Sequence, residues 1–338
     1  MRETNRYFVC LQGATPVPWV PGDSDAINKH TAYFGGALRA MERGLECGGL
    51  VFYLTWDVNA LPSYGDNVVA VVLGDEWARI PAYADRVRAV FKCYGTWPTL
   101  GVRRPSYLSA LTALHVGQVL AARVPTVLRR ALARDGRRPA RVFSVPLGFA
   151  NQVDLPVLPP SRRPYDISFA GSVVHRERPP WSPKRWLKTP KSLSRGAMVG
   201  ALQRLQQNRP DLRVHLTLTS GYAAIQTSDP LTYSRLLADS KVALVPRGTS
   251  FETFRFFEAM RAGCVVVSEA LPRRWFYDGA PAIRIQDWSE LEEVILPILS
   301  DEAEVVRRHR ESLAWWREVC SEEAVGAFMR DALNGLAV

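Results

Sequence analysis

The feature that most constrains this chain is a strand–loop–helix–strand unit that spans residues 242–267. Two continuous apolar runs, Val242–Val245 and Cys264–Val267, are typical of strands that are covered on both faces of a parallel sheet. Gly263 lies just before the second run, where a helix commonly ends on a left-handed residue. The unit therefore predicts a parallel α/β layer in which one helix crosses between two strands.

The loop inside this unit, Pro246–Gly248, has the features of an anion site. It follows the carboxyl end of one predicted strand and precedes a helix N-terminus, which is where phosphates bind in open α/β sheets. Thr249 is expected to cap the helix, with Glu252 three residues later completing a capping box. Arg247 adds a fixed cation with a planar donor fork. The loop therefore predicts a phosphate-binding site.

The same region resembles the exostosin-type glycosyltransferases over roughly the last third of the chain. The residues that carry the resemblance are Tyr233, Leu236, Ser240, Lys241, Pro246–Ser250, Arg255, Glu258, Ala259, Gly263 and Cys264, and it continues through Ser268-Glu269 to Leu271-Pro272. The chain departs from the family at Val266, where proline is usual, and at Phe251-Glu252, which replaces a Pro-Trp or similar pair.

This resemblance implies the GT-B architecture, in which two Rossmann-like α/β domains face a cleft. It implies a nucleotide-sugar donor, with a UDP-sugar favoured, and a glycosyl transfer to a hydroxyl-bearing acceptor (a glycan, a lipid-linked compound or a small molecule). It also implies that Glu258 binds the ribose hydroxyls of the donor. The structural alternative for Glu258 is an ion pair with Arg255 or Arg261 at helical spacing.

Alternating strand and helix patterns along the chain predict the α/β class and two domains. We expect an N-terminal acceptor-binding domain over residues 1–154, a proline-rich linker over 155–164, and a C-terminal nucleotide-sugar-binding domain over 165–338. In the first half, strands are predicted at Tyr7–Leu11, Leu50–Thr55, Asn67–Leu73 and Arg88–Cys93, with intervening helices of which Ala26–Arg43 and Leu108–Leu132 are the clearest.

The second domain supplies the predicted donor site. A strand over Asp166–Ser172 ends in Gly171-Ser172, whose small side chains let a diphosphate approach backbone amides. If that strand is a neighbour of the strand that ends before Arg247, then Gly171-Ser172 and Arg247 lie at the same edge of the sheet. The full predicted nucleotide-sugar site comprises Gly171, Ser172, Arg247, Gly248, Thr249, Ser250, Arg255 and Glu258. The basic segment His175–Arg195 is either a lid over an anionic ligand or, by default, a solvated loop.

An inverting transfer needs a base that takes the proton of the acceptor hydroxyl, and first-half strand ends offer three acids. We rank them Glu76, Asp57 and Asp75. Asp57 followed by Asn59 also suits a turn, and Glu76 also suits a helix cap. His30 and His115 lie on predicted helices and are interpreted as structural. No Asp-x-Asp metal motif is evident, so metal-independent chemistry without a cofactor is expected.

The charge balance favours anionic partners, since 43 Lys and Arg outnumber 33 Asp and Glu to give a formal net charge of +10. A non-catalytic basic protein that binds nucleic acid or a phosphate ligand is therefore the alternative function, although no known nucleic-acid module is evident. The chain starts without an apolar leader and lacks a long apolar run, so a cytoplasmic location is expected.

The predicted helix over residues 107–132 is apolar along Leu108, Leu111, Leu114, Val119, Leu120 and Val124, and several arginines follow it. A core helix followed by a solvated basic loop is the favoured interpretation. Peripheral contact with a membrane surface is the alternative, because an apolar face beside clustered arginines binds anionic lipid.

Overall fold

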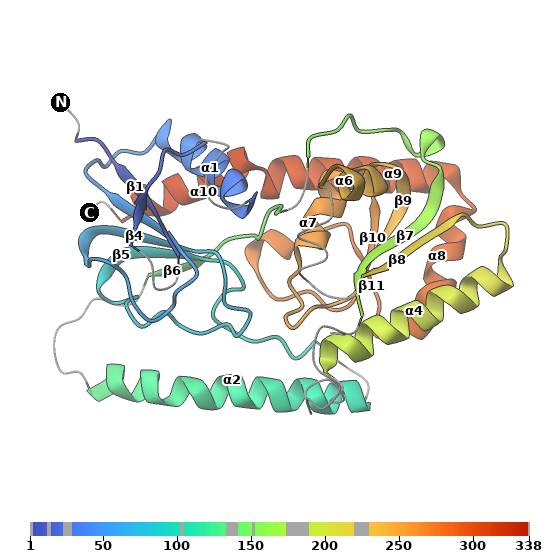
Figure 1. Ribbon diagram of the computed structural model, residues 1–338, viewed down its shortest axis with the longest axis horizontal. Helices are drawn as coiled ribbons and strands as arrows, with labels where there is room; N and C mark the ends of the chain where they lie inside the picture. The colour runs from blue at the N-terminus through green and yellow to red at the C-terminus, as the bar shows by residue number, and fades with distance from the viewer. Residues whose placement is uncertain are drawn as a thin grey trace.

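The computed structural model describes residues 3–11, 15–22, 29–101, 105–132, 141–150, 153–173, 189–219 and 230–336. Two sheets of mainly parallel strands lie side by side, one in each half of the chain (Figure 1). We use "first half" for the elements through β6 and "second half" for those from β7 onward. The predicted fold class, α/β with two Rossmann-like halves, is confirmed by these two sheets.

The first sheet has the strand order β2-β1-β3-β4-β5-β6, and only β2 runs antiparallel to its neighbour. Its strands are β1 (Arg6–Cys10), β2 (Val17–Pro18), β3 (Val51–Thr55), β4 (Gly65–Val72), β5 (Val87–Lys92) and β6 (Val142–Ser144). Helix α1 (Lys29–Glu42) precedes β3, and α2 (Tyr107–Leu132) precedes β6. The connections β3–β4 and β4–β5 are loops, so the prediction of a helix between every pair of strands is wrong there.

The second sheet has the order β11-β10-β9-β7-β8, and all its strands are parallel. They are β7 (Tyr165–Ser172), β8 (Val214–Thr219), β9 (Ser240–Val245), β10 (Val265–Ser268) and β11 (Ile283–Arg284). Strands β8 and β9 lie on opposite sides of β7, so the strand order reverses at β7. In open α/β sheets such a switch point is where ligands bind, outside the carboxyl ends of the strands.

The remaining elements cover the second sheet and return to the first. The helices are α4 (Pro190–Asn208), α6 (Pro230–Ala238), α7 (Phe254–Arg261), α8 (Leu291–Leu299), α9 (Glu302–Trp315) and α10 (Glu322–Asn334), with short helical turns η1 (Pro160–Arg162), η2 (Trp275–Tyr277), η3 (Trp288–Glu290) and η4 (Trp316–Cys320). Helix α10 crosses back to pack on α1, far from the second sheet (Figure 1).

A single apolar core joins the two halves. It contains buried residues of β1, β3, β4 and α1 together with residues of β9, β10 and α7. The ring of Tyr33 on α1 lies 6.1 Å from that of Trp316, and its hydroxyl donates to the carbonyl of Cys320 at 2.7 Å. His30 on α1 meets the Phe254 ring on α7 edge to face at 4.6 Å. The halves are therefore held by close-packed aromatic contacts, which fix one against the other.

Two expectations about the 242–267 unit have different outcomes. Gly263 ends α7 with φ at 71°, as predicted. The predicted capping box is wrong, because α7 begins at Phe254 with Thr253 at the N-cap position. Residues Thr249 and Glu252 lie in the bend before the helix, where Glu252 is buried against Arg274 rather than facing a helix amide.

Helix α2 lies along the surface beneath both halves and contacts α4 (Figure 1). Val119 is buried, but Leu114, Leu120 and Val124 are exposed by 60%, 41% and 52%. The interpretation of this segment as a core helix is therefore wrong. Within the described ranges, no helix combines the length and apolarity needed to cross a membrane.

The contact between α1 and α10 depends on Gly326. A Cβ atom placed there would lie 2.4 Å from the carbonyl oxygen of Ala37 and 2.9 Å from the amide of Met41. We predict that Gly326→Ala lowers the thermal midpoint, because backbone must move, although alanine favours helices by about 1 kcal/mol. The control is Gly117→Ala on α2, where nothing lies within 4 Å. Thermal unfolding should show no loss of stability there, and equal midpoints for both variants would contradict the close packing.

Candidate functional site

The carboxyl ends of β7 and β9 form the edge on which the candidate site is built. Strand β7 pairs in parallel with β9, with Ile167 opposite Val242 and Ser168 opposite Ala243. Gly171 and Ser172 therefore share a sheet edge with Arg247, as expected from the sequence. An added Cβ at Gly171 would lie 2.6 Å from Arg255 Nη2, so glycine permits this close approach.

Arg195 on α4 ties the two strand ends together. Its Nη1 donates to the carbonyl of Ser172 at 2.6 Å, and its Nε donates to the carbonyl of Arg247 at 3.2 Å. The sequence interpretation placed Arg195 in a loop, which is wrong because α4 begins at Pro190 with a capping box between Thr189 and Ser192. That helix-start signal was readable from the sequence. Residues 175–188 of the predicted lid lie outside the described residues.

Arg247, which is buried, and Arg255, which is partly buried, complete a cluster of guanidinium groups. Arg247 Nη1 donates to Thr112 Oγ1 of α2 at 2.9 Å, and its Nη2 donates to the carbonyl of Thr249 at 2.9 Å. The Arg247 guanidinium lies 3.9 Å above the centre of the Phe251 ring. Arg255 donates to the carbonyl of Ala170. In both arginines Nε is buried without a hydrogen-bond partner among the described residues.

The electrostatics of this cluster favour an anion. Burial lowers the pKa of Arg247 to about 10, and that of Arg195 to about 9 with the added repulsion of Arg255. Burial lowers the pKa of Lys191 to about 8, and the positive charge of Arg195 is the next largest cause of this shift. Glu269 accepts the Arg247 amide at 2.9 Å, and burial raises the pKa of its carboxyl. Cations that are desolvated and close to one another gain most from a bound negative charge.

A small cavity, open to solvent, lies between the two halves beside this cluster. Its first-half wall includes Glu76, Trp77, Tyr94, Trp97 and His115, and its second-half wall includes Arg247, Thr249, Ser250, Phe251, Glu252 and Arg274. Such interdomain cavities with a few converging polar groups are common ligand sites.

The two histidines differ in place. His30 is buried, and its Nε2 lies 2.9 Å from the carbonyl of Leu147, so its structural interpretation agrees with this packing. His115 lies on the cavity wall against the Trp77 ring at 4.6 Å, a place the structural interpretation missed. Burial, followed by the charge of Arg247, lowers the pKa of the His115 imidazole.

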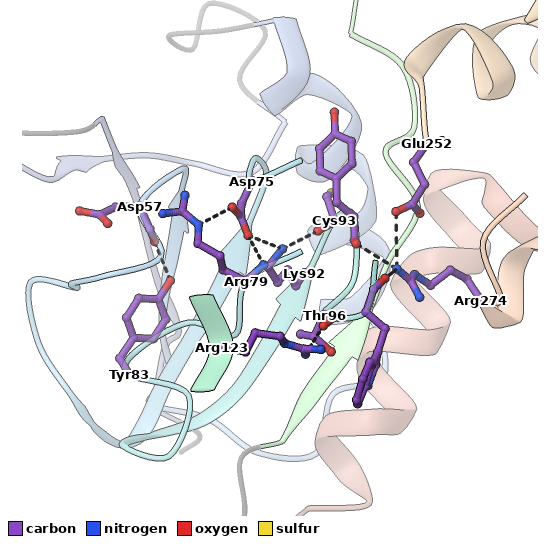
Figure 2. Close-up of polar contacts among 12 residues, drawn as sticks. Asp57, Asp75, Arg79, Tyr83, Lys92, Cys93, Thr96, Arg123, Glu252 and Arg274 are labelled. Carbon is purple, nitrogen blue, oxygen red and sulfur yellow. Dashed lines mark hydrogen bonds and ion pairs between the residues drawn. The ribbon is translucent and has the colours of Figure 1, made fainter. Parts of the chain in front are cut away.

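The three predicted acids occupy different environments. Glu76 is exposed and lines the cavity, in a loop and not at a helix start. Asp75 Oδ2 pairs with Lys92 at 3.1 Å, and its Oδ1 pairs with Arg79 at 2.7 Å, while both the Asp75 and Lys92 side chains are fully buried. Asp57 Oδ1 accepts the Asn59 amide at 2.7 Å, which is the turn alternative. Figure 2 shows Asp75 directed at Arg79 and Lys92.

Glu258 is buried at the junction of the two halves. Its Oε1 accepts the amide of Ala150 at 3.1 Å, and it shares a hydrogen-bonded group with Tyr233 and Arg255. Gly248 and Ser250 close the preceding loop through a backbone hydrogen bond of 2.9 Å. Ribose binding by Glu258 stays a prediction.

Two cavity residues were missed as site residues by sequence reasoning. Glu252 was assigned to a capping box, and Arg274 was not singled out. Arg274 Nη2 donates to the carbonyls of Tyr94 at 3.0 Å and Trp97 at 2.9 Å, across the junction of the halves (Figure 2). Their pairing is tertiary, so no local pattern marks it. Within the described ranges, no three His, Cys, Asp or Glu side chains gather as metal ligands.

Comparison with known proteins gives similarity in shape alone. No family model and no curated protein match the chain, so the exostosin resemblance stays a prediction. Sucrose-phosphate synthase from Thermosynechococcus elongatus is similar with a TM-score of 0.47 and 13% identity, covering 99% of both chains. TarM has a TM-score of 0.47 and 11% identity over 89% of this chain and 58% of its own. A chain of the GtfA/B complex is similar with a TM-score of 0.43 and 12% identity, over 80% of this chain and 58% of its own length. This chain thus spans less than two thirds of TarM and of the GtfA/B chain.

We predict that Asp75 is a structural acid. Asp75→Asn leaves the buried Lys92 ammonium without its counter-charge, which should lower the free energy of unfolding by about 3 kcal/mol. Asp57→Asn is the matched control, because an asparagine oxygen still accepts the turn hydrogen bond and the change should stay within about 0.5 kcal/mol. Urea unfolding of both variants measures the difference, and an unchanged D75N midpoint would contradict the structural assignment.

Proposed function

We propose that the protein is a glycosyltransferase that transfers a sugar from a nucleotide-sugar to a hydroxyl-bearing acceptor. The observation that carries this proposal is the gathering of Arg195, Arg247 and Arg255 at the switch point of the second sheet, beside a cavity between the halves. A diphosphate is the leaving group of such a transfer, and it needs fixed positive charge where its negative charge develops.

The donor diphosphate would lie at the ends of β7 and β9. Arg247 and Arg255 would supply guanidinium donors, with their unpartnered Nε atoms among them. Gly171, Ser172, Gly248, Thr249 and Ser250 would bring backbone amides or hydroxyls close to the phosphate oxygens. This role needs no rearrangement of the sheet, because the strand ends are already aligned.

The finer assignments belong to the same proposal. The resemblance favours UDP as the nucleotide, with Glu258 at the ribose, and a hexosyl or pentosyl group as the sugar. We propose direct, inverting displacement without a metal, in which buried guanidinium groups balance the diphosphate charge. The acceptor hydroxyl would enter through the cavity, whose walls carry carboxylates able to take its proton.

A non-catalytic nucleic-acid-binding protein fits the geometry less well. Nucleic acid is held mainly through phosphates met by exposed Lys and Arg side chains along a surface. Arg195 and Arg247 are instead buried, at 7% and 3% exposure, and they surround a strand end that suits a compact anion.

Thermal stabilisation by a panel of nucleoside diphosphates and nucleotide-sugars tests the proposal directly. A ligand at 100 times its Kd raises stability by about 2.7 kcal/mol, so one nucleotide should raise the thermal midpoint well above the others. A null result across uridine, guanosine, adenosine, cytidine and thymidine diphosphates, with oligonucleotide binding that falls steeply with salt, would favour the alternative.

Arg247 should discriminate between diphosphate and monophosphate. We predict that Arg247→Ala weakens binding of the nucleoside diphosphate by roughly 10- to 100-fold, from a charged hydrogen bond of about 1.5–3 kcal/mol, and weakens the monophosphate much less. Calorimetry measures both affinities. Arg209→Ala is the control, since Arg209 is a surface arginine of the same half that pairs with Asp211. Equal losses for both nucleotides would remove Arg247 from the diphosphate.

Lys191 should make nucleotide binding depend on pH. Its pKa is lowered to about 8, so the side chain is cationic below that pH and neutral above it. We predict that affinity for the nucleoside diphosphate falls as pH rises from 7.5 to 8.5, a range in which the diphosphate keeps its charge. In Lys191→Gln binding should be weaker and should change much less over this range. A pH-independent wild-type affinity would contradict a Lys191 contact.

A further inference from the structure

Glu252 is a buried acid on the wall of the cavity that the sequence did not identify as functional. It lies in the bend before α7 and is 3% exposed. Its Oε2 lies 3.9 Å from Arg274 Nη2, which is longer than a hydrogen bond (Figure 2). A carboxylate at this distance feels the charge of Arg274, yet its oxygens remain available to a hydroxyl that enters the cavity.

Arg274 is held by other groups, so its position does not depend on Glu252. It donates to the carbonyls of Tyr94 and Trp97 from the first half. The ion pair is therefore an addition to an anchored guanidinium. Glu252 can gain or lose a proton without releasing Arg274 from these two carbonyls.

The surroundings of Glu252 tune its proton affinity. Lys92 and Cys93 face it from the end of β5, and Arg274 and Tyr277 face it from around η2. Burial raises the pKa of the Glu252 carboxyl to about 7, opposed by the charges of Arg274 and then Lys92. Lys92 is itself bound to Asp75 and to the carbonyl of Cys93, which limits its effect. A general base works best with a pKa near the working pH.

We propose that Glu252 is the base that accepts the proton of the acceptor hydroxyl, an inference that rests on the proposed glycosyl transfer. In this step the acceptor oxygen forms a bond to the anomeric carbon while its proton moves to a Glu252 carboxylate oxygen. The bond from the anomeric carbon to the diphosphate oxygen breaks, and the electron pair leaves with the diphosphate beside Arg247. Arg247 and Glu252 line the same cavity, as this step requires.

The other ionisable groups of the cavity region suit this role less. Glu76 is exposed and faces Lys191 and Arg195, so it lies toward the cationic cluster that would hold the diphosphate. Asp75 is fully buried in ion pairs. His115 lies against Trp77 and close to Arg247, whose charge opposes proton uptake by the imidazole.

The test is the hydrolysis of bound nucleotide-sugars by water, measured as release of the nucleoside diphosphate. The wild-type rate should rise with pH to a plateau with a midpoint near 7, because the base acts when deprotonated. Glu252→Gln should lower the rate by about 10²–10⁴-fold and abolish this pH step, while the affinity for the nucleoside diphosphate stays unchanged. Glu322→Gln is the control, an isosteric change at another acid whose pKa burial raises, on α10 and away from the cavity. It should keep both rate and pH step.

The outcomes separate this inference from the function on which it rests. A wild-type protein that binds no nucleoside diphosphate contradicts the glycosyltransferase proposal itself. If nucleotide binding holds but Glu252→Gln keeps the rate and the pH step, only the assignment of Glu252 is overturned. Loss of the pH step in Glu76→Gln, with Glu252→Gln unaffected, would transfer the role to Glu76. Absence of hydrolysis from every bound nucleotide-sugar would also count against an activating base.

Discussion

The apolar core that crosses from the first sheet to the second is the constraint on which the rest of the molecule depends. Residues of α1, α7 and the helical turn before α10 interlock as buried aromatics, and α10 then returns to close against α1 through Gly326. Close-packed interiors resist small displacements, so this core sets the spacing of the two sheets. The cavity between the halves is consequently defined by the fold before any ligand arrives, and the groups on its two walls face one another at fixed positions.

A second consequence of this packing is a local excess of buried positive charge. Arg195 and Arg255 donate to backbone carbonyls at the ends of β7 and β9, and Arg247 donates to the carbonyl of Thr249 in the loop after β9, which orients the guanidinium groups but does not neutralise them. Burying a charge costs free energy unless an opposite charge accompanies it. Glu269 and Glu258 supply part of that compensation. In the proposed function a bound diphosphate would supply more, and binding would then recover stability that the free protein gives up to hold these charges.

The sequence predicted the parts of the fold that depend on local pattern. The continuous apolar runs of β9 and β10 identified buried parallel strands, and the small residues at Gly171-Ser172 identified a strand end that shares an edge with Arg247. Other features depend on contacts between distant segments, which local pattern does not encode. The spacing of Thr249 and Glu252 matched a capping box, but burial against Arg274 competes with capping and prevails. Helix α2 had the apolar content of a core helix, yet its position against α4 leaves much of that surface exposed.

Two of the three positions at which the chain departs from the exostosin pattern, Phe251 and Glu252, line the cavity. Phe251 lies beneath the Arg247 guanidinium and is 8% exposed, and Glu252 follows it against Arg274. A proline at the first of these positions would remove the ring that supports Arg247, and a tryptophan at the second would remove the acid while filling its space. The proposed phosphate-binding residues Arg247–Ser250 and the acid Glu252 on the cavity wall therefore belong to one continuous loop between β9 and α7. That loop is held at one end by β9 of the sheet and at the other by α7, whose residues belong to the interdomain core, so both side chains are presented to the cavity by a backbone that is anchored at both ends.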